Sequence, residues 1–289
     1  MTDVVDAGLG GAIERITDPQ LRILCRRFFR FVAPEDVAAH SANGLIAQIE
    51  QMREFAQVRA KGSALVTVRD DRDERDAPFA VAMVVTDDMP FLVDSVSGEL
   101  SLEGRSVRLI IHPQLVVRRN QAGQLLEILD IDVDEDRPSD AIAESWMRID
   151  LDRDYLQADN GASTKRLLQV LEDVRAATAD WLQMRAKAEE IAASLDAHPP
   201  ATLPVAEVKE GSELLRWLTR DNLTFLGYRE YVLATVDGHE VLVPVAGTGL
   251  GILSGEPEAG SGSASAVELP IAVRKKAREN RMLVLTKAN

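Results

Sequence analysis

The stretch FAVAMVVTDDMPFLVDSVSGELSLEGRSVRLIIHPQLVVRRN, residues 79–120, decides the fold that this sequence predicts. It opens with a continuous apolar run, which is typical of a buried strand. After a turn, apolar side chains recur every three to four positions as far as Leu102, which predicts a helix that ends at Gly104. Two β-rich runs follow, residues 105–119 and 124–133, and a hairpin turn joins them. Strand, helix and hairpin in this order predict the core of a ferredoxin-like α+β sandwich.

Two further strands are expected to extend this sheet. One covers residues 64–69, before the opening run, and the other covers residues 144–151, after the hairpin. His112 and Pro113 interrupt the second β-rich run. Because proline cannot donate to a strand ladder, we expect this pair to break or bulge the strand.

The segments around the sandwich divide the chain into four predicted parts. Asp18 followed by Pro19 is typical of a helix start and belongs to an amino-terminal helical segment. An apolar stripe over residues 164–195 predicts one long connecting helix, and the linker HPPATLP at residues 198–204 ends it. A second, smaller α+β unit follows, and residues 269–273 and 282–285 are among its expected strands. The predicted parts are residues 1–62 for the helical segment, 63–160 for the sandwich, 161–198 for the connecting helix and 199–289 for the second unit.

Composition excludes several classes of function. The chain has 289 residues and a formal net charge of -14, which disfavours binding to nucleic acid or to an anionic membrane. Its one cysteine, Cys25, rules out a disulfide within the monomer and is expected to be a buried structural thiol. The sequence has neither a signal peptide nor an apolar run of membrane-spanning length. We therefore expect a cytoplasmic protein without a membrane or nucleic-acid partner.

Two short motifs resemble ligand-binding loops, but each lacks a feature that such a loop requires. The acidic run DIDVDEDR, residues 130–137, resembles a calcium loop, but its sixth position is Glu135 and its twelfth is Ala141 instead of glycine and glutamate. The motif GTGLG, residues 247–251, is followed by Gly255 and Pro257 and not by the helix that a dinucleotide loop needs. We predict no catalytic, cofactor-binding or metal-binding residue in this chain.

The turn after the first apolar strand, DMPFL at residues 88–92, is similar to the opening of ACT regulatory domains, which often bind amino acids. Longer strings resemble the amino-terminal region of the large bacterial NAD-specific glutamate dehydrogenases, in the same order along the chain. These strings are TDDMPFLVDSV, IIHPQLVVRR, LLRWLTRDNLTFLGYREY and GTGLGIL. The resemblance extends from about Arg22 to the end of the chain and implies an ACT-like fold.

The same resemblance implies a function divided between parts of a longer protein. The intact enzyme would oxidatively deaminate L-glutamate to 2-oxoglutarate and ammonia with NAD, in a catalytic domain beyond Asn289. This chain would be a truncated, non-catalytic portion that regulates the enzyme allosterically or assembles its subunits, with no cofactor of its own. Its expected partners are the catalytic domain of the same chain, further copies of itself in a homo-oligomer, and an amino-acid effector.

Two readings of the turn remain open at the sequence level. In the first, backbone N–H groups at the start of the helix receive an effector carboxylate while Asp88 or Asp94 pairs with its ammonium group. In the second, the turn has a structural or assembly role. Phe91, which stands where many ligand-binding ACT domains have glycine, then fills the pocket or seals a domain interface, and it anchors the helix by packing. The candidate effector residues are Asp88, Met89, Pro90, Phe91, Leu92 and Asp94.

Two alternatives to the regulatory role also remain. In the first, the chain acts alone as an amino-acid sensor or a protein-interaction module, which a reading frame ending near Asn289 would favour. In the second, it is a small enzyme with an acidic site near Asp88 and Asp94, which activity of the isolated chain would favour.

Overall fold

The computed structural model describes residues 10–38, 40–73, 76–102, 106–152, 162–236, 239–255 and 267–268. The chain divides into two compact units, Met1–Glu172 and Asp173–Asn289, and the division falls within helix α6 (Ala162–Ala179). No helix among the described residues is long and apolar enough to cross a membrane.

The first unit is built around an antiparallel sheet of six strands in the spatial order β1-β2-β6-β4-β5, with β3 also paired to β6. The strands are β1 Leu65–Arg72, β2 Pro78–Asp87, β3 Val107–Ile111, β4 Gln114–Arg119, β5 Leu125–Leu129 and β6 Ala141–Leu151. The α+β fold class predicted from the sequence is confirmed.

The connection of β2 to β4 through helix α5 (Leu92–Leu100) gives this sheet its ferredoxin-like character. Both β2 and β4 run antiparallel to β6, which lies between them, so the two strands are parallel and form a split βαβ unit. The predicted interruption at His112 and Pro113 is confirmed, because β3 ends at Ile111 and β4 begins at Gln114. Both short strands therefore pair along the same edge of β6.

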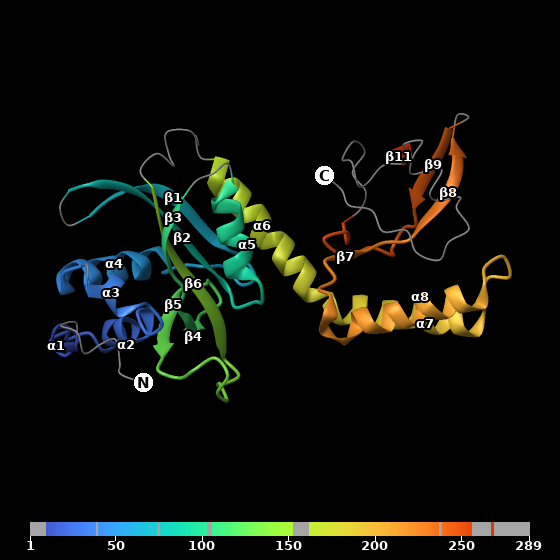
Figure 1. Cartoon of the computed structure of the whole chain (residues 1–289). Helices are drawn as coiled ribbons and strands as arrows, with labels where there is room; N and C mark the ends of the chain where they lie inside the picture. The colour runs from blue at the N-terminus through green and yellow to red at the C-terminus, as the bar shows by residue number, and fades with distance from the viewer. Residues whose placement is uncertain are drawn as a thin grey trace. The chain divides into compact units, whose positions relative to one another are not determined.

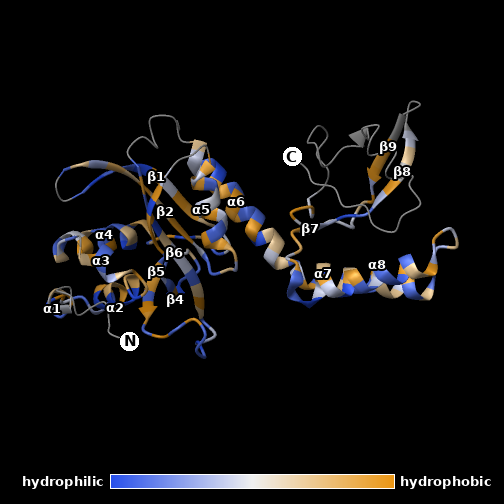
Figure 2. Cartoon of the chain, in the orientation of Figure 1, coloured by the Kyte–Doolittle hydropathy of each residue, from blue (hydrophilic) through white to orange (hydrophobic). Residues whose placement is uncertain are grey.

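Helices lie on both sides of the sheet (Figure 1). On one side lie α1 (Gly10–Ile13), α2 (Pro19–Phe28), α3 (Pro34–Ala38) and α4 (Ala42–Phe55), and on the other lie α5 and the beginning of α6. The main core packs α2 and α4 against alternate residues of the strands, and Figure 2 shows hydrophobic residues on β2 and on the helices beside the sheet. Its largest side chain is Trp146, which is fully buried.

The start of α2 forms as the sequence predicts. The Asp18 side chain accepts hydrogen bonds from the backbone N–H of Gln20 at 2.8 Å and of Leu21 at 3.3 Å, and Pro19 occupies the first helical position. Cys25 lies on the buried face of this helix, where burial raises the pKa of its thiol to about 12. A thiol with that pKa is not a nucleophile at neutral pH.

The second unit pairs two helices, α7 (Trp181–Ala197) and α8 (Val205–Trp217), which lie side by side. Its described strands form a two-stranded sheet, β10-β7, and a three-stranded sheet, β11-β9-β8. Their bounds are β7 Gly227–Tyr228, β8 Tyr231–Val236, β9 His239–Pro244, β10 Leu250–Gly251 and β11 Val267–Glu268. The further strands expected at residues 269–273 and 282–285 lie outside the described residues.

The prediction of a single long helix over residues 164–195 is wrong in one respect, because two helices cover this range. The chain leaves helical geometry at Asp180, where φ is -103° and ψ is 5°, and this residue separates α6 from α7. Its carboxylate accepts a hydrogen bond from the backbone N–H of Gly251 at 2.9 Å. A stripe of apolar residues gives no sign of such a break, because the stripe continues on both sides of it. The division of the chain into four parts stays a prediction.

Candidate functional site

The predicted effector turn connects the end of β2 to α5. The backbone N–H of Asp88 donates to Ala143 O at 3.0 Å, which extends the pairing of β2 with β6 beyond the last strand residue. The Asp88 carboxylate accepts hydrogen bonds from Ser145 Oγ at 2.5 Å and from Gln114 Nε2 at 2.9 and 3.0 Å. The side chain of Asp88 is therefore held in place by two neighbouring strands.

Ser145 links Asp88 to a histidine at the strand break. Its Oγ lies 3.0 Å from His112 Nε2, and because the Ser145 hydroxyl donates to Asp88, it must accept from the histidine. Burial lowers the pKa of His112, although the negative charge of Asp88 opposes this effect. A neutral imidazole that donates to the serine cannot take its proton, so this Asp–Ser–His arrangement fixes Asp88 and does not create a nucleophile.

Phe91 differs from its expected role as an apolar anchor. The residue is 48% exposed, and the apolar anchors of α5 are instead the buried side chains of Leu92, Val96 and Leu100. Phe91 also has a left-handed backbone, with φ 68° and ψ 4°. This conformation favours glycine, because a Cβ atom crowds the following carbonyl. Strain of this kind is typical of functional turns.

We expect Phe91→Gly to raise the free energy of unfolding by about 1 kcal/mol, because it releases backbone strain and removes an exposed ring. Urea denaturation of the 289-residue chain measures the change. Phe31→Gly is the matched control, since Phe31 is 77% exposed and does not have positive φ. A loss of stability in Phe91→Gly would contradict the strain at this position.

The start of α5 is open to an anion. Its N-cap position is Phe91, whose ring cannot accept the hydrogen bonds that a serine or aspartate would take from the first-turn N–H groups. Asp94 lies in that first turn and is exposed, as is Pro90, whereas Met89 is half-buried and Leu92 is buried. The turn thus presents backbone donors and one exposed carboxylate within the same helical turn.

A buried ion cluster, Asp87–Arg59–Glu144–Arg119, supports the turn from the opposite face of the sheet. Arg59 is fully buried and donates to Glu144 at 2.7 and 3.0 Å and to Asp87 at 2.6 Å. Arg119 donates to both oxygens of Glu144 at 2.6 and 2.9 Å, and Trp146 Nε1 donates to the same carboxylate at 2.9 Å. Each oxygen of this buried carboxylate therefore accepts at least two hydrogen bonds.

The charges of this cluster determine the ionisation of Glu144. Burial by itself raises the pKa of a carboxyl group, but the hydrogen bonds from Arg119 and the positive charge of Arg59 outweigh it and lower the pKa of Glu144 below its ordinary value. Glu144 is ionised at neutral pH. The cluster fixes the position of Asp87, the residue immediately before the turn.

The sequence identified the turn but missed most of the residues that position it. Ser145, Gln114 and His112 hold Asp88, and Arg59, Glu144 and Arg119 hold Asp87. The available signal was the placement of polar residues within strands that are otherwise apolar, such as Glu144 and Ser145 before Trp146.

A split βαβ sheet with a proline-containing turn into its crossing helix defines a domain of the ACT class. Residues 24–167 match the family model described as "Glutamate dehydrogenase, ACT1 domain", and this part of the chain belongs to that family. The resemblance to the NAD-specific glutamate dehydrogenases is confirmed.

Two relatives carry the name NAD-specific glutamate dehydrogenase. The chain is 37% identical to the protein of Halomonas elongata over 169 residues. This alignment covers 58% of this chain and 10% of that relative. It is 30% identical to the protein of Pseudomonas aeruginosa over 219 residues. This second alignment covers 75% of this chain and 13% of that relative. The chain therefore spans only a small part of the length of the relatives it matches.

Proposed function

We propose that this chain is a regulatory and assembly portion of an NAD-dependent glutamate dehydrogenase. In this proposal the oxidative deamination of L-glutamate to 2-oxoglutarate and ammonia, with NAD as the oxidant, takes place in another domain of the same protein. The observation that carries the proposal is the ACT1 match over residues 24–167, which includes the whole sheet and its turn. The names of the two relatives support the choice of reaction and cofactor.

We further propose that the turn is an effector site for an amino acid. The carboxylate of the effector binds the open N–H groups of the first turn of α5, and its ammonium group pairs with Asp94. Asp88 has a different role from the one the sequence suggested, because its oxygens already accept hydrogen bonds from Ser145 and Gln114. Its contacts with these two strands shape the turn.

Assembly into a homo-oligomer is proposed to use the outer edge of β1, which ends the sheet order on one side. Strand β5 ends the order on the other side, but the backbone N–H groups of Leu125 and Ile128 there already donate to Gln57 O and to Gln20 Oε1. An edge strand is suited to pairing with a second copy of the same domain. The protein that contains this chain is proposed to be cytoplasmic, as the reaction of its relatives suggests.

The effector proposal is tested on the full-length protein that contains this chain. The formation of NADH from L-glutamate is measured with and without each of the other standard amino acids, in the wild type and in the Asp94→Asn variant. We expect at least one amino acid to change the rate, and about tenfold more of it to be needed in Asp94→Asn, because an ion pair to the ammonium is lost.

Glu54→Gln is the matched control, since Glu54 is an exposed carboxylate on α4 and lies outside the turn. The same amino acid should also raise the melting temperature of the isolated 289-residue chain, because it binds the folded state alone. A rate that no amino acid changes would overturn the effector site. A full-length protein that forms no NADH would overturn the choice of enzyme.

A further inference from the structure

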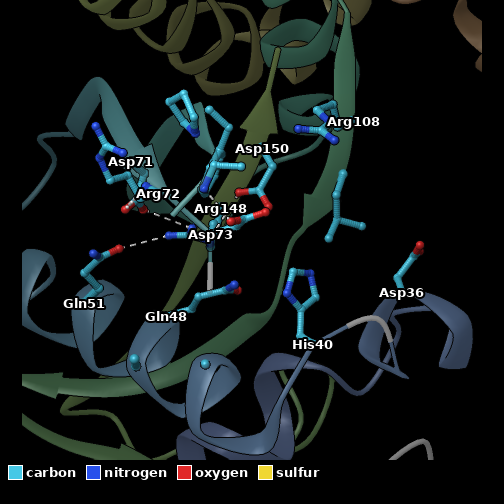
Figure 3. A pocket seen from close by; sticks show the side chains of 16 residues that line it. Asp36, His40, Gln48, Gln51, Asp71, Arg72, Asp73, Arg108, Arg148 and Asp150 are labelled. Carbon is cyan, nitrogen blue, oxygen red and sulfur yellow. Dashed lines mark hydrogen bonds and ion pairs between the residues drawn. The ribbon is translucent and has the colours of Figure 1, made fainter. Parts of the chain in front are cut away.

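The first unit contains a cavity of about 470 Å³ between the sheet and helices α3 and α4. Figure 3 shows the side chains around it, which come from the strands on one side and from the helices on the other. The cavity lies at the Phe79 end of β2, whereas the effector turn follows Asp87 at the other end. Ten extended residues span about 30 Å, so the cavity is separate from the turn.

The floor of the cavity is a buried arginine. Arg148 is 1% exposed, and its guanidinium group donates to Gln51 Oε1 at 3.1 Å and to Asp71 Oδ2 at 3.3 Å. The ring of Phe79 packs 6.0 Å from the same group. Two of the three sides of this guanidinium therefore have partners in the fold.

The third side faces a carboxylate without a hydrogen bond. Arg148 Nε lies 3.3 Å from Asp150 Oδ1, but the angle does not suit a hydrogen bond. Both atoms are buried, and neither has a hydrogen-bond partner within the described part of the chain. Buried polar atoms are nearly always hydrogen-bonded, so this pair of atoms needs an explanation.

The environment of Asp150 leaves its negative charge poorly compensated. Its side chain is 13% exposed, and burial raises its pKa, an effect that the nearby charges of Arg148, His40 and Arg108 oppose and that of Asp71 reinforces. A cationic group of a ligand beside Asp150 would compensate its negative charge. A purely structural cluster would not need Asp150, because Asp71 and Gln51 already hydrogen-bond Arg148.

A positive group stands at the opening of the same cavity. Arg108 on β3 is 59% exposed, and its distance to the carboxylate of Asp152 is 3.7 Å, longer than a hydrogen bond. Its guanidinium group can therefore take a carboxylate in the two-pronged geometry that arginine favours. The cavity thus offers an anionic group inside and a cationic group at its mouth.

We propose that this cavity binds a small zwitterion, with its ammonium group hydrogen-bonded to Asp150 and its carboxylate paired with Arg108. A free amino acid has this chemistry and is small enough for the cavity. The charged residues that line it sum to one negative charge, which favours a ligand with a cationic group. They are Asp36, Asp71, Asp73, Asp150, Arg72, Arg108 and Arg148. This site does not depend on the effector turn.

The test is calorimetric titration of the 289-residue chain with L-alanine, L-glutamate and L-lysine, and with the N-acetyl derivative and methyl ester of each. The titrations use the Asp94→Asn variant, so that the turn does not contribute, and the wild-type chain is titrated in parallel. We expect at least one amino acid to bind with Kd below about 10 mM, and both of its derivatives to bind about tenfold more weakly or not at all.

Arg108→Gln and Asp150→Asn are each expected to raise this Kd at least about tenfold. Arg118→Gln is the matched control, because Arg118 is a partly exposed arginine on β4 that does not line the cavity, and its Kd should not change. Since Arg108 is exposed, its variant tests the site even if Asp150→Asn fails to fold.

Three results would overturn the proposal. One is that no amino acid binds in this range, and another is that Arg108→Gln binds as well as its parent. A third is that a methyl ester or an N-acetyl derivative binds as tightly as the free amino acid. Binding to the chain with an intact turn that disappears in Asp94→Asn would instead belong to the effector turn, and would support that proposal while rejecting this one.

Discussion

Glu144→Ala is expected to destabilise the first unit by about 3–5 kcal/mol, the largest loss we expect from any single carboxylate in this chain. The reason is that two buried arginines pair with Glu144. Arg59 is fully buried and the Arg119 side chain is 5% exposed, and both rely on this carboxylate for their charge balance. Removing it leaves two guanidinium groups in the interior with only Asp87 and backbone carbonyls as partners. Urea denaturation measures the loss.

Glu127→Ala is the control, because Glu127 also pairs with an arginine, Arg118, but at the surface. Its side chain is 44% exposed, and we expect a loss below about 1 kcal/mol. Equal losses in the two variants would contradict the role of the buried cluster. A fall in cooperativity without a shift in the midpoint would also do so, since the cluster acts on the native state.

The difference between the wild type and Glu144→Ala should depend on pH. The pKa of Glu144 lies below its ordinary value of 4.5 in the folded chain, so its contribution to stability is fully present above that ordinary value. The contribution is lost as pH falls through the lowered pKa of the folded state. The two chains should therefore differ most at neutral pH and converge in acid. Denaturation midpoints measured from pH 7 downward test this.

Local patterns in the sequence predicted the parts of the fold that depend on local physics. The apolar run before the turn became β2, the spaced apolar residues became α5, and His112 with Pro113 divided a strand. Each of these outcomes follows from a few neighbouring residues, through side-chain periodicity or through the missing N–H of proline. The Asp18 cap of α2 was predictable for the same reason.

The interior charges could not be predicted in this way, because they depend on residues far apart in the chain. Glu144, Arg148 and Asp150 alternate along β6 like the polar face of a half-exposed strand. In the structure helices of the amino-terminal segment cover that face, and residues from other strands and loops neutralise the charges. The left-handed backbone of Phe91 was equally hidden, since phenylalanine rarely adopts it.

Gly123→Ala is the second substitution for which we expect a large effect, a loss of roughly 3 kcal/mol or more. Gly123 has φ +80°, and a Cβ atom at this position would lie 2.3 Å from Arg59 O, a backbone atom that cannot rotate away. The turn at Gly123 and the segment around Arg59 are bonded directly, because Arg59 N–H donates to Gly123 O at 2.9 Å. Alanine must push these two backbone segments apart.

Gly62→Ala separates this clash from backbone strain. Gly62 has a similar φ of +76°, but a Cβ atom there meets nothing within 4 Å, so we expect a loss of only about 1 kcal/mol from the left-handed backbone. Thermal and urea denaturation of both variants give the difference. If the two losses are equal, the close approach of Gly123 to Arg59 contributes nothing to the loss of stability in Gly123→Ala. If Gly123→Ala loses more, the excess measures how firmly the hairpin holds Arg59, and with it the cluster that fixes Asp87 before the effector turn.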